Sequence, residues 1–315
     1  PMRLLSIAIL AGFGFVAAPP SEAFDLQGHR GARGLMPENT LPAFTRAIGL
    51  GVDILELDTV ITADGVVVVT HDRALKPGIA RRDGEWIAEP VLVRSLSRAE
   101  LDRYDVGRLD PTSRGASRFP NQTPVDGTRV PSLSQVFDLA KKRGGKTLRF
   151  NIETKLSPLA PDETPDPETF ARALVAEIEK AGIADRTIVQ SFDWRTLAVV
   201  RDIAPGIKTA YLTAAQRWLD NLEVGRDGAS PWLGGTDIDD HHGSAPRAIK
   251  ALGGDIWSPF HRELTAEALK EAHDLGLEVH VWTVNAEADI RRLLEMGVNG
   301  IITDYPDVAR AVMAK

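Results

Sequence analysis

The sequence predicts an α/β fold of the (β/α)8 TIM-barrel type, with an antiparallel hairpin arm and an insertion after the second barrel strand. Short β-rich runs alternate with amphipathic helical segments, as in parallel βαβ units. When one hairpin strand is set aside, eight strands remain and each is followed by a helix. Residues 24–315 are enough for one such barrel of about 250 residues plus insertions, so we expect a single catalytic domain.

The strand candidates are short apolar or β-branched runs at 25–28, 53–59, 66–70, 148–154, 187–192, 208–213, 255–258, 278–284 and 300–304. The helix candidates follow an apolar period of about 3.6 residues at 39–50, 132–143, 167–182, 194–204, 264–275, 286–296 and 305–314, with one more after 214. Surplus length lies in an insertion at about 73–131 and in a loop-rich segment at 214–254.

The run 66–70 is the strand that does not fit a barrel. Only a few residues separate it from 53–59, which is too short for a parallel crossover, and Asp64-Gly65 is a strong hairpin signal. We therefore expect 66–70 to return antiparallel. If Asp64 and Gly65 are the two turn residues, Asp58 lies directly across from His71, and cross-strand partners share a face of the sheet.

Charge and cysteine content exclude several kinds of function. The net charge is −7 and there is no basic block, so neither nucleic acid nor an acidic membrane surface is an expected partner. Cysteine is absent, which excludes disulfides, thiolate catalysis and cysteine metal sites.

The N-terminus has the pattern of a secretory leader. Arg3 precedes an apolar run at 4–18, and a small-x-small pattern ends at Ala23. We expect residues 1–23 to be a signal peptide cut before Phe24, which places the mature protein outside the cytoplasm, in the periplasm, without stable membrane insertion. An uncleaved anchor and a buried helix are the alternatives.

Charged residues interrupt two strands that a barrel should bury. Glu56 and Asp58 share one face of DILELDT, and Glu153 alternates with apolar residues in LRFNIETK. Inward carboxylates are costly unless they are paired or bind a metal, and three oxygen donors suit Mg²⁺ or Ca²⁺. A structural salt-bridge network with Arg149 and Lys155 is the alternative.

His29 and Arg30 end the first strand, at the C-terminal face of the barrel, where barrel enzymes have their active sites. The following Pro-Glu-Asn-Thr segment is interpreted as helix-entry structure with Asn39 as the N-cap. Two histidines, His29 and His71, suit paired acid and base catalysis. Arg30, Lys155 and a divalent ion would stabilise a phosphoryl centre. The residues thus predict a metal-assisted phosphodiesterase.

The sequence resembles the glycerophosphodiester phosphodiesterase family. The matching stretches run in family order from residue 26 to 307 and are GHRGARGLMPENTLPAF, LELDTVITADGVVVVTHD, PSLSQVF, NIETK, QSFDW, VHVWTVN and GVNGIITDYP. The resemblance implies a (β/α)8 barrel with an insertion after strand two. It also implies hydrolysis of small glycerophosphodiesters to sn-glycerol 3-phosphate and an alcohol.

The resemblance implies a role for each candidate residue. His29 and His71 match the catalytic acid/base pair, and the expected ligands of one divalent cation, Ca²⁺ or Mg²⁺, are Glu56, Asp58 and Glu153. The expected substrate contacts are Arg30 and Lys155 on the phosphate, Trp282 on the glycerol, and Gln190 as a polar neighbour. In related barrel phosphodiesterases the substrate's own hydroxyl can attack phosphorus and give a cyclic phosphate that water then opens, and the resemblance makes this the mechanistic hypothesis for the chain.

Several alternatives stay open. A lysophospholipase D or sphingomyelinase-D-like activity would be favoured by an exposed apolar rim, and a periplasmic binding protein without turnover is the other class. The aromatics Trp86, Tyr104 and Phe119 are interpreted as a small core of the insertion, and a cap over the pocket is the alternative. The cluster at 237–242, DIDDHH, is interpreted as an exposed loop, and contact with substrate at the pocket rim is the alternative. The leaving alcohol, the choice between Ca²⁺ and Mg²⁺, and the oligomeric state are not fixed by the sequence.

Overall fold

The structure, a computed structural model, describes residues 24–314. The expected signal peptide at 1–23 lies outside the described residues. Eight parallel strands form the barrel: β1 (Asp25–Gly28), β2 (Ile54–Ile61), β9 (Arg149–Thr154), β10 (Thr187–Ser191), β11 (Lys208–Thr213), β14 (Ile256–Pro259), β15 (Glu278–Val281) and β16 (Gly300–Thr303). β1 pairs with both β2 and β16, so the sheet closes on itself and the predicted barrel is confirmed.

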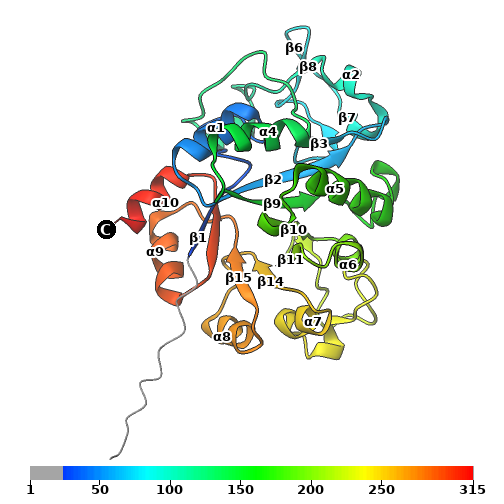
Figure 1. The fold of residues 1–315 in the computed structure, drawn as a ribbon, viewed down its shortest axis with the longest axis vertical. Helices are drawn as coiled ribbons and strands as arrows, with labels where there is room; N and C mark the ends of the chain where they lie inside the picture. Colours follow the sequence, from blue (N-terminus) through cyan, green and yellow to red (C-terminus); the bar gives the residue numbers. More distant parts are fainter. Residues whose placement is uncertain (1–23, 315) are drawn as a thin grey trace, which may run out of the picture.

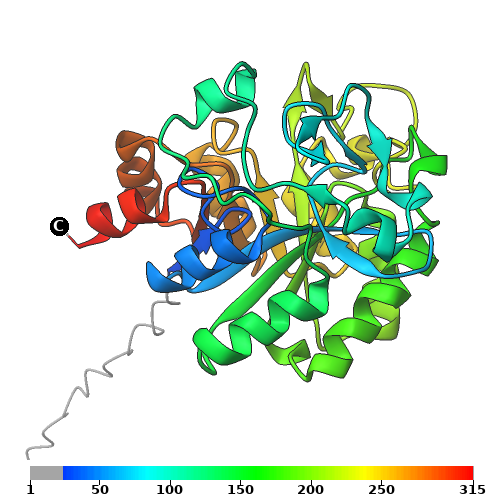
Figure 2. The ribbon, with the colours of Figure 1, turned by 90° about the horizontal axis from the view of Figure 1, so that it is seen from above.

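A ring of helices surrounds the strands (Figures 1 and 2). They are α1 (Leu41–Gly49), α4 (Leu133–Arg143), α5 (Pro167–Ala181), α6 (Trp194–Ile203), α7 (Ala245–Ala251), α8 (Ala266–Asp274), α9 (Glu287–Met296) and α10 (Pro306–Met313). Each has one apolar face, as in α5, where Phe170, Leu174 and Ile178 recur at intervals of four residues and are fully buried. This spacing places them on one side of the helix, against the sheet.

The hairpin arm exists, but its register differs from the prediction. β3 (Val67–Val69) pairs antiparallel with β2, and Ile61 faces Val67. The backbone N–H of Thr70 donates to the carbonyl of Asp58 at 3.0 Å. Asp58 therefore lies across from Thr70, and the predicted pairing with His71 was wrong by one residue.

The turn explains this slip. Thr62 and Val66 close the loop with a backbone hydrogen bond of 3.0 Å, so three residues form the turn instead of two. Gly65 has φ of +83°, the left-handed conformation that a three-residue hairpin loop with a glycine bulge requires. Asp64 also accepts a hydrogen bond from the Thr62 hydroxyl at 2.6 Å, which fixes the wider loop.

The insertion after the arm has a small core of its own. Its elements are β4 (Ala74–Leu75), β5 (Arg81–Arg82), β6 (Glu85–Trp86), β7 (Val91–Leu92), α2 (Arg98–Leu101), β8 (Tyr104–Asp105) and α3 (Arg114–Arg118). Tyr104 is buried in this core with Leu75, Val93 and Leu101, as predicted. Trp86 and Phe119 instead lie against arginine side chains, of Arg81 and Arg33 respectively.

The second loop-rich segment contains the short hairpin β12 (Ala215–Gln216) and β13 (Leu219–Asp220) before α7. The cluster at 237–242 contributes a 3-10 turn, Ile238–His241, and its polar side chains are exposed or half-buried. Over residues 24–314, none of the helices combines the length and the apolar character that crossing a bilayer requires.

Candidate active site

A pocket of about 970 Å³ opens at the carboxyl ends of the barrel strands. Eight of the nine predicted site residues line it: His29, Arg30, Glu56, His71, Glu153, Lys155, Gln190 and Trp282. The ninth, Asp58, is 1% exposed and contacts Arg30 and Lys155 from below the pocket wall. The fold thus brings the whole predicted set together.

His29 follows β1 and is oriented by a carboxylate. Its Nδ1 lies 2.6 Å from Oδ1 of Asp304, directly after β16. Because a carboxylate only accepts, Nδ1–H donates and Nε2 is left as the free nitrogen. Asn285 donates to the other Asp304 oxygen at 2.7 Å and holds it in place. Burial lowers the pKa of His29, and the Asp304 charge partly opposes this effect.

His71 has a parallel arrangement beyond the end of β3. Its Nδ1 lies 3.3 Å from Oδ1 of Asp72, and its Nε2 lies 3.1 Å from Nζ of Lys155. The lysine ammonium can only donate, so Nε2 of His71 is unprotonated here. Burial and the nearby charges of Arg30 and Lys155 lower the pKa of His71 to about 4.

Three carboxylates converge beside the histidines. Glu56, Asp58 and Glu153 each offer one oxygen, and these oxygens all lie within 4.8 Å of one another. Burial raises the pKa of Glu56 well above its usual value, and the Asp58 charge adds to this effect. Burial also raises the pKa of Glu153, to about 7, against the opposing charge of Lys155.

The pKa of Asp58 is shifted in the opposite direction, downward. Burial alone would raise its pKa, but the charges of His71, Lys155 and Arg30 outweigh burial and hold the pKa well below its usual value. Its Oδ1 is buried without a hydrogen-bond partner. An ionised, unsatisfied carboxylate oxygen beside two further carboxylates fits a divalent cation with oxygen ligands. The residues present therefore fit the predicted ion.

Arg30 is held by the segment that follows it. Its backbone N–H donates to Oε2 of Glu56 at 2.9 Å, and its Nη1 donates to Glu38 at 2.8 Å. Ion pairing with Arg30 and Arg33 holds the pKa of Glu38 at about 2, although burial would raise it. Arg30 is thus fixed beside the carboxylates with φ of +51°.

The interpretation of Pro-Glu-Asn-Thr as helix entry was wrong for two residues. Thr40, not Asn39, is the N-cap of α1, and its side chain accepts from the N–H of Ala43. Asn39 has φ of +56°, which turns its side chain toward β2, where Nδ2 donates to Oδ2 of Asp58 at 2.9 Å. Glu38 and Asn39 thus belong to the site.

Gln190 is 1% exposed and lies beneath the pocket surface. Its Nε2 donates to Oε1 of Glu56 at 2.7 Å, and its Oε1 accepts from Asn151 at 3.0 Å. Both ends of the amide are therefore occupied by protein groups. The structure places Gln190 against a carboxylate of the cluster.

Trp282 belongs to an aromatic wall on another side of the pocket. The wall consists of Phe192, Trp218, Phe260 and Trp282, whose neighbouring ring centroids lie 5.3–6.0 Å apart. Trp282 Nε1 donates to the carbonyl of Ser258 at 2.9 Å, which fixes the ring. Trp218, in the β12–β13 turn, is 59% exposed at the pocket mouth.

The sequence interpretation missed Asp304, which lies within the quoted GVNGIITDYP stretch. The available signal was a lone carboxylate directly after the last barrel strand, where polar residues face the mouth. His261 was given no role, yet it is 4% exposed, lines the pocket and has no partner at Nδ1.

Comparison with known proteins shows which family the chain belongs to. Residues 29–308 match the model of the glycerophosphoryl diester phosphodiesterase family. A glycerophosphodiester phosphodiesterase of Bacillus subtilis is 28% identical over 292 residues, which cover 90% of this chain and 84% of the relative. A crystal structure from Silicibacter pomeroyi DSS-3 that carries the family's name is 36% identical, covers 94% of both chains and superimposes with a TM-score of 0.83.

A more distant structure shares the fold. It is a phosphodiesterase from Oleispira antarctica in complex with sn-glycerol-3-phosphate, 19% identical over 92% of this chain and 97% of that chain, with a TM-score of 0.68. The family match spans nearly all of the barrel, and the site residues predicted from the sequence lie around one pocket. The chain belongs to the glycerophosphoryl diester phosphodiesterase family and is a phosphoric diester hydrolase that acts on glycerophosphodiesters.

Proposed function

We propose that this enzyme hydrolyses glycerophosphodiesters to sn-glycerol 3-phosphate and an alcohol by a cation-dependent mechanism in which His29 and His71 transfer the protons. The observation that carries the proposal is the symmetry of the two imidazoles. Each has Nδ1 against a carboxylate, of Asp304 or Asp72, while Nε2 is free of a carboxylate, and both line the pocket.

The two histidines have complementary tasks. In the first step the Nε2 of one histidine takes the proton of the attacking hydroxyl, while the other, protonated, gives its proton to the leaving alcohol oxygen. The substrate's own glycerol hydroxyl attacks phosphorus, so the bond to the leaving alcohol breaks and a cyclic phosphate forms. In the second step water opens the ring, and the histidines exchange roles.

The three carboxylates supply the proposed cation site. Glu56, Asp58 and Glu153 are the residues that would hold the ion. A bound Ca²⁺ or Mg²⁺ would withdraw charge from the phosphoryl oxygens and offset the carboxylates. Arg30 and Lys155 bring positive charge to the same place and would contact the phosphate, while Trp282 would pack against the glycerol carbons.

The direct test is release of sn-glycerol 3-phosphate from a panel of glycerophosphodiesters with choline, ethanolamine, glycerol and inositol leaving groups. Each substrate is assayed with chelator and with Ca²⁺ or Mg²⁺ restored. We expect release of the phosphomonoester, loss of activity with chelator, and recovery with one of the ions. Full activity in a chelated sample from which metal analysis finds no bound ion would remove the cation from the mechanism.

A second candidate function is the lysophospholipase D activity among the alternatives. It is favoured by the aromatic wall, because Trp218 extends the apolar surface from Trp282 to the exposed mouth of the pocket. A monoacyl glycerophosphodiester would present the same phosphate to the site and place hydrocarbon on this wall. The predicted leader would place either activity in the periplasm, which N-terminal sequencing of the mature protein tests by a start at Phe24.

A further inference from the structure

A line of buried side-chain amides crosses the barrel interior, from the active-site end to the opposite end. It joins Gln190 on β10, Asn151 on β9 and Gln27 on β1, and none of the three is more than 1% exposed. Asn151 Nδ2 donates to both neighbours, to Oε1 of Gln190 at 3.0 Å and to Oε1 of Gln27 at 2.8 Å. The line is therefore continuous.

Each end of this line meets an ionisable residue. At the active-site end, Nε2 of Gln190 donates to Oε1 of Glu56 at 2.7 Å. At the other end, Nε2 of Gln27 lies 2.9 Å from Nδ1 of His280 on β15. Glu56 and His280 are both buried, with exposed fractions of 2% and 0%.

The donors and acceptors along the line have one direction when Glu56 is ionised, the form that holds a cation. The ionised carboxylate only accepts, so the NH₂ group of Gln190 faces Glu56 and its carbonyl faces Asn151. That carbonyl needs a donor, which places the NH₂ group of Asn151 between the two glutamines. The carbonyl of Gln27 accepts the second hydrogen, and its NH₂ group then faces His280. Nδ1 of His280 must accept, so the proton of the neutral imidazole lies on Nε2.

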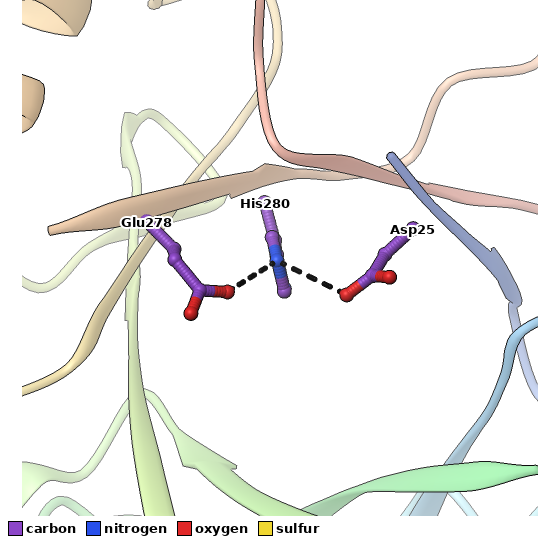
Figure 3. A group of neighbouring side chains, drawn as sticks. All are labelled: Asp25, Glu278 and His280. Carbon is purple, nitrogen blue, oxygen red and sulfur yellow. Dashed lines mark ion pairs between the residues drawn. The ribbon is translucent and has the colours of Figure 1, made fainter. Parts of the chain in front are cut away.

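The position of that proton decides what the base of the barrel can bind. Nε2 of His280 points between two carboxylates, 3.4 Å from Oε2 of Glu278 and 3.8 Å from Oδ2 of Asp25 (Figure 3). One imidazole and two carboxylates within 4.8 Å have the composition of a metal site. A protonated Nε2 cannot coordinate a metal, because a ligating nitrogen needs its lone pair.

The two carboxylates are also already paired with cations. Arg149 binds both oxygens of Asp25, and Lys208 lies 2.5 Å from Glu278. A metal ion would have to displace these side chains as well as the proton of His280. The carboxylates are therefore held by cationic side chains, and Nε2 of His280 lies at ion-pair distance from both of them without a hydrogen bond.

We propose that Gln190, Asn151 and Gln27 are positioning residues with two effects: they orient Glu56 for the cation, and they keep the proton of His280 on Nε2. As a result, Asp25, Glu278 and His280 form an ion-paired anchor at the base of the barrel and not a second cation site. The Glu56 part rests on the proposed function. Gln190 binds Oε1 of Glu56 while the N–H of Arg30 binds Oε2. These two hydrogen bonds fix the plane of the carboxylate.

The tautomer is tested without any activity assay. Nitrogen-15 NMR of the histidine side chains, with the His280 signal identified by its loss in His280→Gln, reports which nitrogen carries the proton. We expect a protonated Nε2 and a bare Nδ1. A proton on Nδ1 with a bare Nε2 would overturn the direction of the line.

The cation count is a second test. Metal analysis after dialysis against Ca²⁺, Mg²⁺ or Zn²⁺ is expected to find at most one ion per chain, and Asp58→Asn removes it. An ion that persists in Asp58→Asn and is lost in His280→Gln would show that the base does bind a cation, and would overturn the anchor.

The positioning of Glu56 is tested by Asn151→Leu, or by Gln190→Met if the first variant does not fold. The ion concentration that gives half-maximal activity is expected to rise by about 10-fold to 100-fold, as for other residues that orient metal ligands. Asn299→Leu is the control, because Asn299 at the barrel base binds Val279 N–H and His273 and lies off the line. We expect it to lower the melting temperature and to leave the ion requirement unchanged.

A lower melting temperature with an unchanged ion requirement in both Asn151→Leu and Gln190→Met would overturn the positioning role. An enzyme that needs no ion would instead refute the cation-dependent mechanism of the proposed function, and with it the claim that the amides orient Glu56 for a cation. The NMR result would still decide whether the proton of His280 lies on Nε2. The failure of the proposed function and the failure of this inference are therefore distinguishable.

Discussion

Asp304 Oδ1 accepts a 2.6 Å hydrogen bond from His29 Nδ1, and this pair joins the first and the last strands of the barrel across its closure. Asp304 is 1% exposed, and both His29 and Asn285 hold its carboxylate. Burial would raise the pKa of Asp304, but electrostatic attraction and the hydrogen bond from His29, the Arg33 charge and the Asn285 hydrogen bond keep that pKa well below its usual value. Asp304 therefore stays ionised and fixes the imidazole with Nε2 toward the pocket.

Asp304→Asn should lower kcat without a comparable change in KM. The amide can present its NH₂ group to Nδ1 of His29, which would move the imidazole proton to Nε2 and block the base. We expect a loss of about 10²-fold to 10⁴-fold in kcat, measured by steady-state kinetics. Asp307→Asn, three residues further along in the first turn of α10, is the control and should retain full activity. An equal loss in both variants would contradict the pairing.

Cation binding should stabilise the wild-type fold through Asp58. An ion at about 100 times its Kd adds about 2.7 kcal/mol, which corresponds to a rise in melting temperature of about 5 °C or more for a chain of this size. Calorimetry with and without Ca²⁺ or Mg²⁺ measures this shift. Asp58→Asn should abolish it, and Asp64→Asn at the hairpin tip should not. A shift of full size in Asp58→Asn would remove Asp58 from the ligand set.

The titration of Glu278 should make the free energy of unfolding depend on pH in the acid range. Burial would raise its pKa, but hydrogen bonds and charges from His280 and Lys208 outweigh burial and lower the pKa to about 2 from a usual value of 4.5. A lowered native pKa stabilises the fold above the unfolded value, and this contribution is lost as pH falls from about 4.5 to about 2.

The variant Glu278→Gln lacks this titration. Allowing for partial exposure, we expect the wild type to exceed it by about 1–2 kcal/mol in free energy of unfolding at pH 7. Urea unfolding at pH 7 and pH 3 should show that difference shrink to less than half. A difference that stays constant between the two pH values would contradict the assignment.

Trp218→Ala should separate the two candidate substrates. Removing an aromatic contact to hydrocarbon costs about 1–1.5 kcal/mol, or about 5-fold to 10-fold in KM for a lysophospholipid. KM for glycerophosphocholine should stay within about 2-fold, because Trp218 lies at the mouth and away from the carboxylates. Leu252→Ala, an exposed apolar residue after α7, is the control. Equal KM values for lysophospholipid in all three proteins would remove the second candidate.

The barrel could be predicted from the sequence because each strand and helix carries its own local signal. Alternating apolar residues reveal a buried strand, and carboxylates such as Glu56 and Glu153 are conspicuous inside one. The C-terminal face of a barrel then dictates where such residues meet. The candidate site residues could therefore be predicted from the strands that carry them and from the rule that barrel enzymes have their active sites at the carboxyl ends of the strands.

What could not be predicted depends on backbone conformation and long-range contacts. The hairpin register depended on one extra loop residue, with Gly65 at positive φ. The Asp64-Gly65 dipeptide does not distinguish a two-residue loop from a three-residue loop. Asn39 resembled an N-cap until its positive φ was known. Asp304 lies 275 residues from His29, and no local pattern reports such a pair.

The division of proton transfer between two histidines is the central claim, and the identity of the leaving group tests it most directly. His29→Ala and His71→Ala are compared on glycerophosphocholine and on a glycerophosphodiester of p-nitrophenol, whose leaving anion needs no proton. Both variants should lose about 10²-fold or more in kcat on glycerophosphocholine. One of them, the variant lacking the acid, should recover most of its activity on the p-nitrophenyl ester. Full activity of either variant on glycerophosphocholine, or equal impairment of both on the two substrates, would contradict the two-histidine mechanism.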